Sequence, residues 1–217
     1  MKRKKKGTWM MTGGLLLIAA ALLLACFNLW DERRAANSAG EALRELETLR
    51  PEEPETVEEP EIPDYVLDPG REMPAVEADG GRYIGVLELP SLGLALPVME
   101  TWSYPSLRVA PCRYSGSAYE DDLIIAAHNY KTHFGRLKEL RPGDEVRFTD
   151  TEGNAFRYTV AELETLGKYD VEEMAAGDWD LTLFTCTYGG QSRVTARCLR
   201  VAGEPSDPSG IWSRSGK

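Results

Sequence analysis

Hydrophobic positions in this chain follow three patterns. A long apolar run occupies 7–30 and contains no Asp, Glu, Lys or Arg. A sparsely apolar stretch follows, and from residue 81 onward short apolar runs alternate with turn residues. As a helix, the first run would measure about 36 Å, enough to cross a hydrocarbon core of about 30 Å. The patterns predict a membrane-spanning helix at 7–30, a linker and one folded domain at 81–203.

The short apolar runs predict strands. They are rich in β-branched, aliphatic and aromatic residues and are separated by Gly, Pro, Asp and Asn. A short helix is expected at 134–140. The predicted strands are 83–89, 94–98, 123–127, 145–149, 156–163, 181–186 and 194–201. Seven or more short strands in about 120 residues favour a closed or nearly closed β-barrel over a parallel α/β sheet.

The charges around the apolar run predict its direction in the membrane. Residues 2–6 are all Lys or Arg, whereas Asp31, Glu32, Arg33 and Arg34 balance one another after the run. Excess positive charge stays on the cytoplasmic side. We therefore expect 1–6 to be a cytoplasmic tail and the folded domain to lie outside the cell.

Two other interpretations of the apolar run were weighed. A cleaved signal peptide would need a small-x-small site, and Phe27, Asn28, Leu29 and Trp30 stand where it should be. The sequence Leu23-Leu24-Ala25-Cys26 resembles a bacterial lipoprotein cleavage box, which would put a lipid on Cys26. The apolar run continues past Cys26, so an uncleaved anchor is the preferred interpretation. Either outcome tethers the domain to the membrane.

The charge of the external part excludes one class of partner. Five of the 25 basic residues precede the span, and all 35 acidic residues follow it, so the remainder carries a formal net charge of −15. Such a surface repels phosphate backbones, and a role in binding nucleic acid is not expected.

Two segments connect the span to the domain. Residues 31–49 carry Leu43, Leu46 and Leu49 at a spacing of three, which predicts a short, exposed juxtamembrane helix. Residues 50–80 are rich in Pro and Glu and read as a stiff spacer. As an alternative, Tyr65-Val66-Leu67 would fold back over the active site as a lid.

A hairpin near the C-terminus brings reactive groups together. The strand 181–186 is followed by Gly189-Gly190, a two-residue hairpin signal. With that loop, Cys186 lies opposite Arg193, with Cβ atoms about 5 Å apart. The positive charge of Arg193 favours the thiolate form of Cys186, and the N–H groups of its guanidinium can donate hydrogen bonds to an oxyanion.

His128 adds a partner for the thiol. It ends the buried strand 123–127, as Cys186 ends its own strand. Taken alone, Cys186 would be read as a small buried apolar residue. A cysteine and a histidine at strand ends are instead the usual pair for thiol acyl transfer.

Each expected role has a rival. Arg197 shares a strand face with Arg193, but the register puts it opposite Thr182, four residues from Cys186. His133 lies in a polar stretch and is expected to be an exposed loop residue. Cys112 and Cys198 lack the paired spacing of a zinc site and are expected to be separate buried thiols. The Thr185 hydroxyl either contacts substrate or satisfies a strand position.

Taken together, these residues resemble the sortase family of cysteine transpeptidases. The resemblance rests on Leu183-Phe184-Thr185-Cys186, Arg193 and His128, and extends over 81–201. Ala127 departs from the glycine that many members carry before the histidine. The pair His128-Asn129 looks more like class B than class A, which does not decide the class.

The resemblance implies a fold and an activity. The fold would be a mostly β, eight-stranded sortase barrel. The catalytic residues would be Cys186, His128 and Arg193, with Thr185 adjacent to substrate. The substrate would be a C-terminal sorting signal of the Leu-Pro-x-Thr-Gly kind on a surface protein, and the acceptor an amine of a cell-wall precursor or a pilin lysine. No cofactor is expected; some sortases use calcium, and the sequence shows no convincing set of ligands.

Two other functions remain open. A cysteine hydrolase would use the same residues with water as acceptor, and a catalytically silent wall-binding module would keep only the barrel. Papain-like proteases are disfavoured because their cysteine precedes the histidine. Residues 204–217 read as a C-terminal tail.

Overall fold

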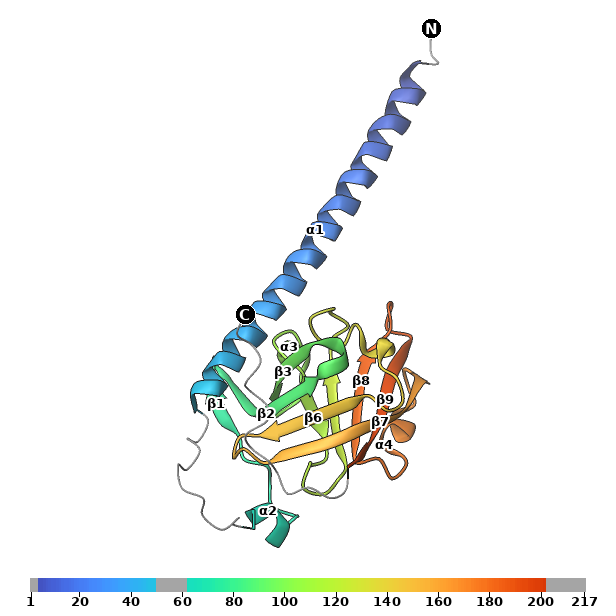
Figure 1. The fold of residues 1–217 in the computed structure, drawn as a ribbon. Helices are drawn as coiled ribbons and strands as arrows, with labels where there is room; N and C mark the ends of the chain where they lie inside the picture. The colour runs from blue at the N-terminus through green and yellow to red at the C-terminus, as the bar shows by residue number, and fades with distance from the viewer. Residues whose placement is uncertain (1–3, 50–61, 202–217) are drawn as a thin grey trace.

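A computed structural model describes residues 4–49 and 62–201, and side chains from residue 9 onward. It consists of a β-barrel and one long N-terminal helix that leans on it (Figure 1). The predictions for the start of the basic tail, for 50–61 in the linker and for the tail at 204–217 lie outside the described residues.

The barrel is closed by eight strands. They are β2 (Gly81–Leu89), β3 (Leu94–Met99), β4 (Cys112–Ser115), β5 (Leu123–Ala127), β6 (Glu145–Asp150), β7 (Ala155–Gly167), β8 (Leu181–Cys186) and β9 (Ser192–Arg200). Their order is β2-β3-β4-β5-β8-β9-β7-β6, and β6 pairs with β2 to close the sheet. A ninth strand, β1 (Val76–Ala78), pairs antiparallel with β2 outside this ring. The predicted eight-stranded sortase-like barrel is confirmed.

Apolar side chains fill the barrel and also form a layer outside it. Leu181 and Leu183 are fully buried in the main core, together with Leu87, Ile125 and Phe148 among others. Phe184, on the opposite face of β8, belongs to a separate cluster outside the sheet. The helices α3 (Tyr104–Leu107) and α4 (Val171–Ala175) cover that cluster with Leu107 and Met174. The outer face of β5 and β8 is therefore partly covered.

Sequence patterns predicted the strands better than the short elements. β5 and β8 have the predicted bounds, whereas β4 was missed because its four residues are mostly polar. The helix expected at 134–140 is a single 3-10 turn at Leu137–Glu139, η2. Phe134, Leu137 and Leu140 are all buried, and their spacing of three suits a 3-10 turn. A second such turn, η1 (Pro90–Leu92), joins β2 to β3.

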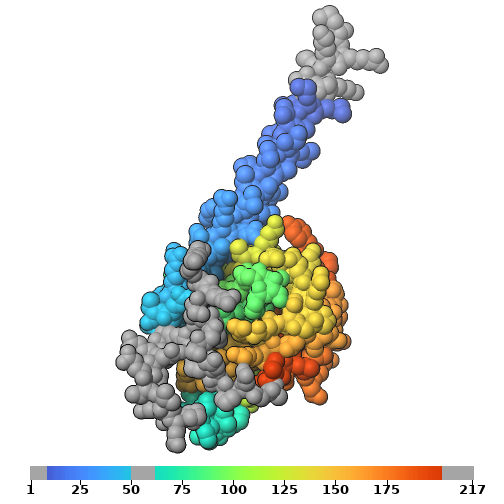
Figure 2. All heavy atoms as spheres, viewed as in Figure 1, coloured from blue at the N-terminus to red at the C-terminus, as the bar shows by residue number. Residues whose placement is uncertain are grey.

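The N-terminal helix α1 runs unbroken from Lys4–Leu49. Its N-terminal part is long and apolar enough to serve as a membrane anchor, and stands clear of the barrel (Figure 2). Its C-terminal part lies on the barrel through one stripe of buried residues, Ala35, Ala39, Ala42 and Leu46. The helix predicted at 31–49 is present as the continuation of the span, but the expectation that it is exposed is wrong. Small alanines at helical spacing let the helix come close to the barrel.

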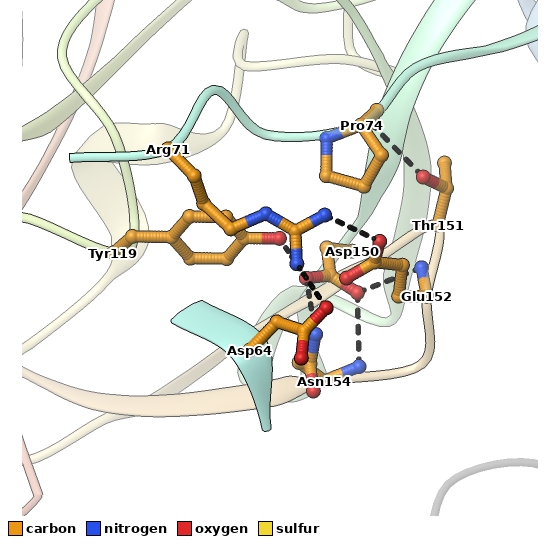
Figure 3. A network of polar contacts seen from close by, with 8 residues as sticks. All are labelled: Asp64, Arg71, Pro74, Tyr119, Asp150, Thr151, Glu152 and Asn154. Atoms are coloured by element: carbon orange, nitrogen blue, oxygen red, sulfur yellow. Dashed lines mark hydrogen bonds and ion pairs between the residues drawn. The ribbon is translucent and has the colours of Figure 1, made fainter. Parts of the chain in front are cut away.

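Residues 62–75 are tied to the end of the barrel where β5 begins. Tyr65, in α2 (Asp64–Leu67), stacks on Tyr119 with ring centroids 4.9 Å apart. Figure 3 shows Arg71 pairing with Asp64 and with Glu152, at 3.3 and 2.8 Å. Thr151 Oγ1 also donates to the Pro74 carbonyl at 3.0 Å. Tyr119 precedes β5, whereas His128 follows it, so Tyr65-Val66-Leu67 does not lie over Cys186, contrary to the lid alternative.

Because of residues 62–75 and β1, the folded domain starts before Gly81. Met73 and Ala75 pack in the main core, and β1 pairs with β2. The folded unit therefore includes residues upstream of Gly81, the expected boundary. Proline and glutamate dominate the composition before Gly81. This composition predicted a spacer, although a few apolar residues within it pack against the barrel.

Candidate active site

Cys186 and His128 lie at the ends of two strands that pair with each other. β5 and β8 pair in parallel, with Ala127 opposite Thr185 as the last matched pair. Thr185 Oγ1 donates a buried hydrogen bond to the Ala127 carbonyl at 2.8 Å. Cys186 is the last residue of β8, and His128 is the first residue after β5, so both lie at the same end of the sheet. The Thr185 hydroxyl satisfies a strand position, the second of the two roles considered for it.

Arg193 faces Cys186 in the predicted register. The turn has both glycines at positive φ, 82° for Gly189 and 70° for Gly190, a backbone conformation that glycine adopts without strain. Arg193 Nη1 donates to the carbonyls of Gly190 and Ser192, both at 3.2 Å. Cys186 and Arg193 are both half-buried. The hairpin therefore places Arg193 directly across from a partly accessible thiol.

Backbone hydrogen bonds shape the loop that carries His128. The His128 carbonyl accepts from Phe134 N at 3.2 Å, and the Tyr130 carbonyl accepts from Gly135 N at 2.7 Å. A Cβ atom at Gly135 would lie 2.7 Å from that Tyr130 oxygen, so this close turn requires glycine. Phe134 anchors the loop in the core with no exposed surface.

Electrostatics at His128 favour the neutral ring. Burial lowers the pKa of His128 most, the positive charge of Arg108 lowers it further, and Asp31 opposes both. Asp31 belongs to α1, the helix that carries the apolar span. No sequence signal connected a residue before the linker with this histidine, because the two are 97 positions apart in the numbering.

His133 is buried, contrary to the expectation of an exposed loop residue. Its exposed fraction is zero, neither ring nitrogen makes a hydrogen bond of good geometry among the described residues, and the Ala35 backbone of α1 is the polar group that raises its pKa. Burial lowers the pKa of His133 to about 4, with the neighbouring His128 also lowering it. The polar residues around His133 suggested a solvated loop, but α1 packs over this region and excludes water.

Arg197 has a structural role. Its guanidinium is almost fully buried and binds Glu164 Oε1 at 2.6 Å. It also donates to the carbonyls of Glu173 and Met174, at 2.6 and 2.7 Å, and to Thr182 Oγ1 at 3.0 Å. These bonds fasten α4 to β8 and β9. Arg197 is fully engaged there, away from Cys186, which leaves Arg193 as the arginine beside the thiol.

A cavity of about 640 Å³ opens beside Cys186. One wall comes from the loop after β5 and from the β8–β9 hairpin, and the opposite wall from the helix residues Asn28, Asp31 and Glu32. The cavity therefore lies between the barrel and the helix, next to the end of the apolar span. No pattern in the sequence indicates that this helix reaches the site.

An aromatic surface lies on the outer face next to Cys186. Phe184, two residues before the cysteine, contacts Tyr114 edge-on at 5.3 Å between ring centroids. Trp102 lies 5.9 Å from Tyr114 and 5.3 Å from Tyr104. Trp102, Tyr104 and Tyr114 are partly exposed. This surface was missed because α3 and β4 were not predicted.

The remaining thiols do not join the site. Cys112 and Cys198 are buried and unbonded, as expected, and burial raises the pKa of each to about 12. Cys26 is an exposed residue of α1; its lipidation stays an open prediction. Among the described residues, no three His, Cys, Asp or Glu side chains gather as ligands for a metal ion.

Comparisons with known proteins place this geometry in a family. A curated relative, sortase D of Bacillus subtilis, is 26% identical over 106 residues, 48% of this chain and 52% of that protein. The chain thus spans about half the length of that relative. Among solved structures, sortase A of Corynebacterium diphtheriae aligns with a TM-score of 0.53 and 22% identity, covering 59% of this chain and 65% of that one.

A second solved structure, sortase A of Listeria monocytogenes, aligns with a TM-score of 0.50 and 20% identity, over 57% of this chain and 90% of that one. At these identities the two structures support the fold alone. The sortase-domain family model matches residues 87–202, more than half of the chain, and includes Cys186, His128 and Arg193. This chain belongs to the sortase family, whose homologues are cysteine transpeptidases.

Proposed function

We propose that this chain is a membrane-anchored transpeptidase in which Cys186 is the nucleophile, His128 the general acid and base, and Arg193 the oxyanion ligand. One observation carries the proposal: the registers of β5 with β8 and of β8 with β9 bring these three residues to one end of the sheet. A thiol, an imidazole and a guanidinium are the groups that acyl transfer through a thioester requires.

The first half-reaction is acylation. The Cys186 thiolate attacks the carbonyl carbon of a peptide bond, and the oxygen becomes an oxyanion beside the Arg193 guanidinium. The C–N bond breaks, and His128, as imidazolium, gives its proton to the departing amine. The product is a thioester between Cys186 and the new C-terminus. Arg193 suits its role because its fork has five N–H donors, of which the turn carbonyls use few.

The second half-reaction transfers the acyl group. An incoming primary amine gives a proton to neutral His128 and attacks the thioester carbonyl. The C–S bond breaks, and Cys186 leaves as thiolate. The new amide restores the starting enzyme, with His128 again protonated. No oxidant, reductant or metal enters this cycle.

The donor substrate would be a C-terminal sorting signal of the Leu-Pro-x-Thr-Gly kind, cut after the threonine. The aromatic surface of Trp102, Tyr104, Tyr114 and Phe184 supports an apolar peptide, because it adjoins Cys186 on the same face of the sheet. Burying apolar side chains there would contribute binding energy in proportion to area.

The acceptor would be an amine carried by a wall precursor or a pilin. The cavity between the barrel and α1 supports an acceptor held at the membrane, because Cys186 shares it with Asn28, near the end of the apolar span. The positive residues before the span favour a cytoplasmic N-terminus, and the barrel would then act on the outer surface of the cell membrane.

The test uses the full chain in detergent micelles and a library of sorting-signal peptides. Intact mass would report a thioester adduct, and adding triglycine would release a peptide–triglycine product. Cys186→Ala should form no adduct, whereas Cys26→Ser, which removes the exposed thiol on α1, should behave as wild type. Release by water alone would favour the hydrolase alternative. Absence of any adduct would overturn the proposal and favour the silent module.

A further inference from the structure

Tyr130 lies between the catalytic histidine and the membrane helix. Its ring centroid is 5.1 Å from that of His128 and 5.4 Å from that of His133. The Tyr130 side chain is half-buried, and the turn through its carbonyl fixes the backbone that carries it. The phenol therefore extends from the His128 loop toward α1.

The Tyr130 hydroxyl makes a hydrogen bond to a carboxylate of α1. Tyr130 Oη donates to Asp31 Oδ2 at 2.5 Å. Asp31 Oδ1 also accepts from Arg34 Nη2 at 3.1 Å, which holds the carboxylate from its own helix. A negative charge on the membrane helix thus lies one side chain away from His128, across 97 positions of sequence.

Other contacts keep the helix in this place. Lys131 N donates to Glu32 Oε1 at 2.8 Å, one residue further along both segments. Ala35, one turn on, is completely buried. At the far end of the docked part, Asp79 N donates to Glu45 Oε2 at 2.6 Å. The position of Asp31 is therefore set by contacts along the docked length of the helix.

We propose that Asp31 and Tyr130 are positioning residues for His128, so that the membrane-anchoring helix supplies the third member of the catalytic site. The inference rests on the proposed function and adds to it. Tyr130 would hold the orientation of the imidazole, and Asp31 would favour its protonated form. A barrel without α1 would keep Cys186, His128 and Arg193 but lose this support.

The charges around His128 explain why the Asp31 carboxylate matters for the pKa of the ring. Arg108, the residue that follows α3, opposes protonation of the ring with its guanidinium. On the loop that carries His128, His133 is buried and neutral, and Tyr130 is a neutral phenol. Burial and the Asp31 hydrogen bond raise the pKa of Tyr130 to about 12, so the phenol stays a donor. Asp31, from α1, is the negative charge that raises the pKa of His128. An imidazole that must release a proton to the leaving amine needs such an anion.

The first test measures His128 directly, without activity. The chain has two histidines, so histidine-labelled full-length protein in micelles gives two imidazole signals by NMR, and a His133→Leu sample assigns them. Asp31→Asn keeps an acceptor for Tyr130 but removes the charge, and should move the His128 titration to lower pH. Glu45→Gln changes a helix-to-barrel carboxylate at the far end of the docked part and should leave the His128 titration unchanged. An unchanged titration in Asp31→Asn would overturn the inference.

The second test measures peptide–triglycine formation. Asp31→Asn and Tyr130→Phe should each lower kcat roughly tenfold with KM nearly unchanged, and Asp31→Glu should recover part of the loss. Glu45→Gln should keep wild-type kcat. A shifted titration with normal kcat in Asp31→Asn would overturn the positioning role. If wild type forms no thioester, the proposed function fails, and the NMR titration decides whether Asp31 still acts on His128.

Discussion

Thr185 donates its hydroxyl hydrogen to the carbonyl of Ala127, and this buried bond joins the residues that precede Cys186 and His128. The two residues are also the last matched pair between β5 and β8. The next residues are Cys186, which ends β8, and His128, which follows β5. A single hydroxyl therefore helps fix the separation between thiol and imidazole.

We predict that Thr185→Val lowers both stability and acylation. The valine leaves the buried Ala127 carbonyl without this donor, which should cost about 1–2 kcal/mol in the free energy of unfolding. Thr149→Val is the matched control, because the buried Thr149 hydroxyl has no partner among the described residues. Urea unfolding and adduct formation would be measured for both. Equal loss of stability in the two variants would contradict the prediction.

The two arginines on β9 should separate function from stability. Arg193→Gln should slow acylation by about 10²-fold while changing stability by less than about 0.5 kcal/mol. Arg197→Met should cost at least about 2 kcal/mol, because it orphans Glu164, Thr182 and two carbonyls. Unfolding curves and single-turnover acylation would test both. A stable, inactive Arg197→Met variant would reverse the assignment.

His133 should make the protein sensitive to acid. Its pKa is lowered from 6.5 to about 4 in the folded state, so below about pH 6.5 the unfolded chain takes up a proton that the folded chain does not. Stability therefore falls as pH drops from about 6.5 to 4, by about 3 kcal/mol in total.

The variant His133→Leu should lose about 3 kcal/mol less than wild type between pH 7 and pH 4. At pH 7 it should be at least as stable, because it removes two buried ring nitrogens without partners. Urea unfolding at pH 7, 5.5 and 4 would measure the difference. Parallel losses in the two proteins would show that His133 is not the sensor.

The aromatic surface should affect peptide binding more than chemistry. Trp102→Ala and Tyr104→Ala should each raise KM for the sorting peptide about three- to tenfold, with kcat nearly unchanged. Leu199→Ala is the control, because this exposed apolar residue lies toward the other end of β9. Steady-state transpeptidation would measure the constants. Unchanged KM in both aromatic variants would place the peptide elsewhere.

Much of the site was determined by local sequence. Alternating apolar residues predicted β5 and β8, and the Gly189-Gly190 turn signal predicted the hairpin register that the structure shows. Both glycines adopt positive φ, in a turn whose backbone bonds run from Gly190 N to the Thr187 carbonyl and from Thr187 N to the Ser192 carbonyl. That register alone placed Arg193 opposite Cys186 and Arg197 opposite Thr182. These are short-range relationships, in which the chain pattern and turn geometry leave little freedom.

Tertiary structure decided what lies around those residues. The pairing of β5 with β8 brings His128 beside Cys186, and the docking of α1 buries His133 and brings Asp31 to Tyr130. The sequence indicated an exposed helix at 31–49 because its three leucines form a weak apolar face, whereas three alanines contact the barrel together with Leu46. Small side chains carry little hydrophobic signal, yet they let backbones approach closely. Only the folded structure shows that the small side chains of α1 contact the barrel and that this contact brings Asp31 to Tyr130.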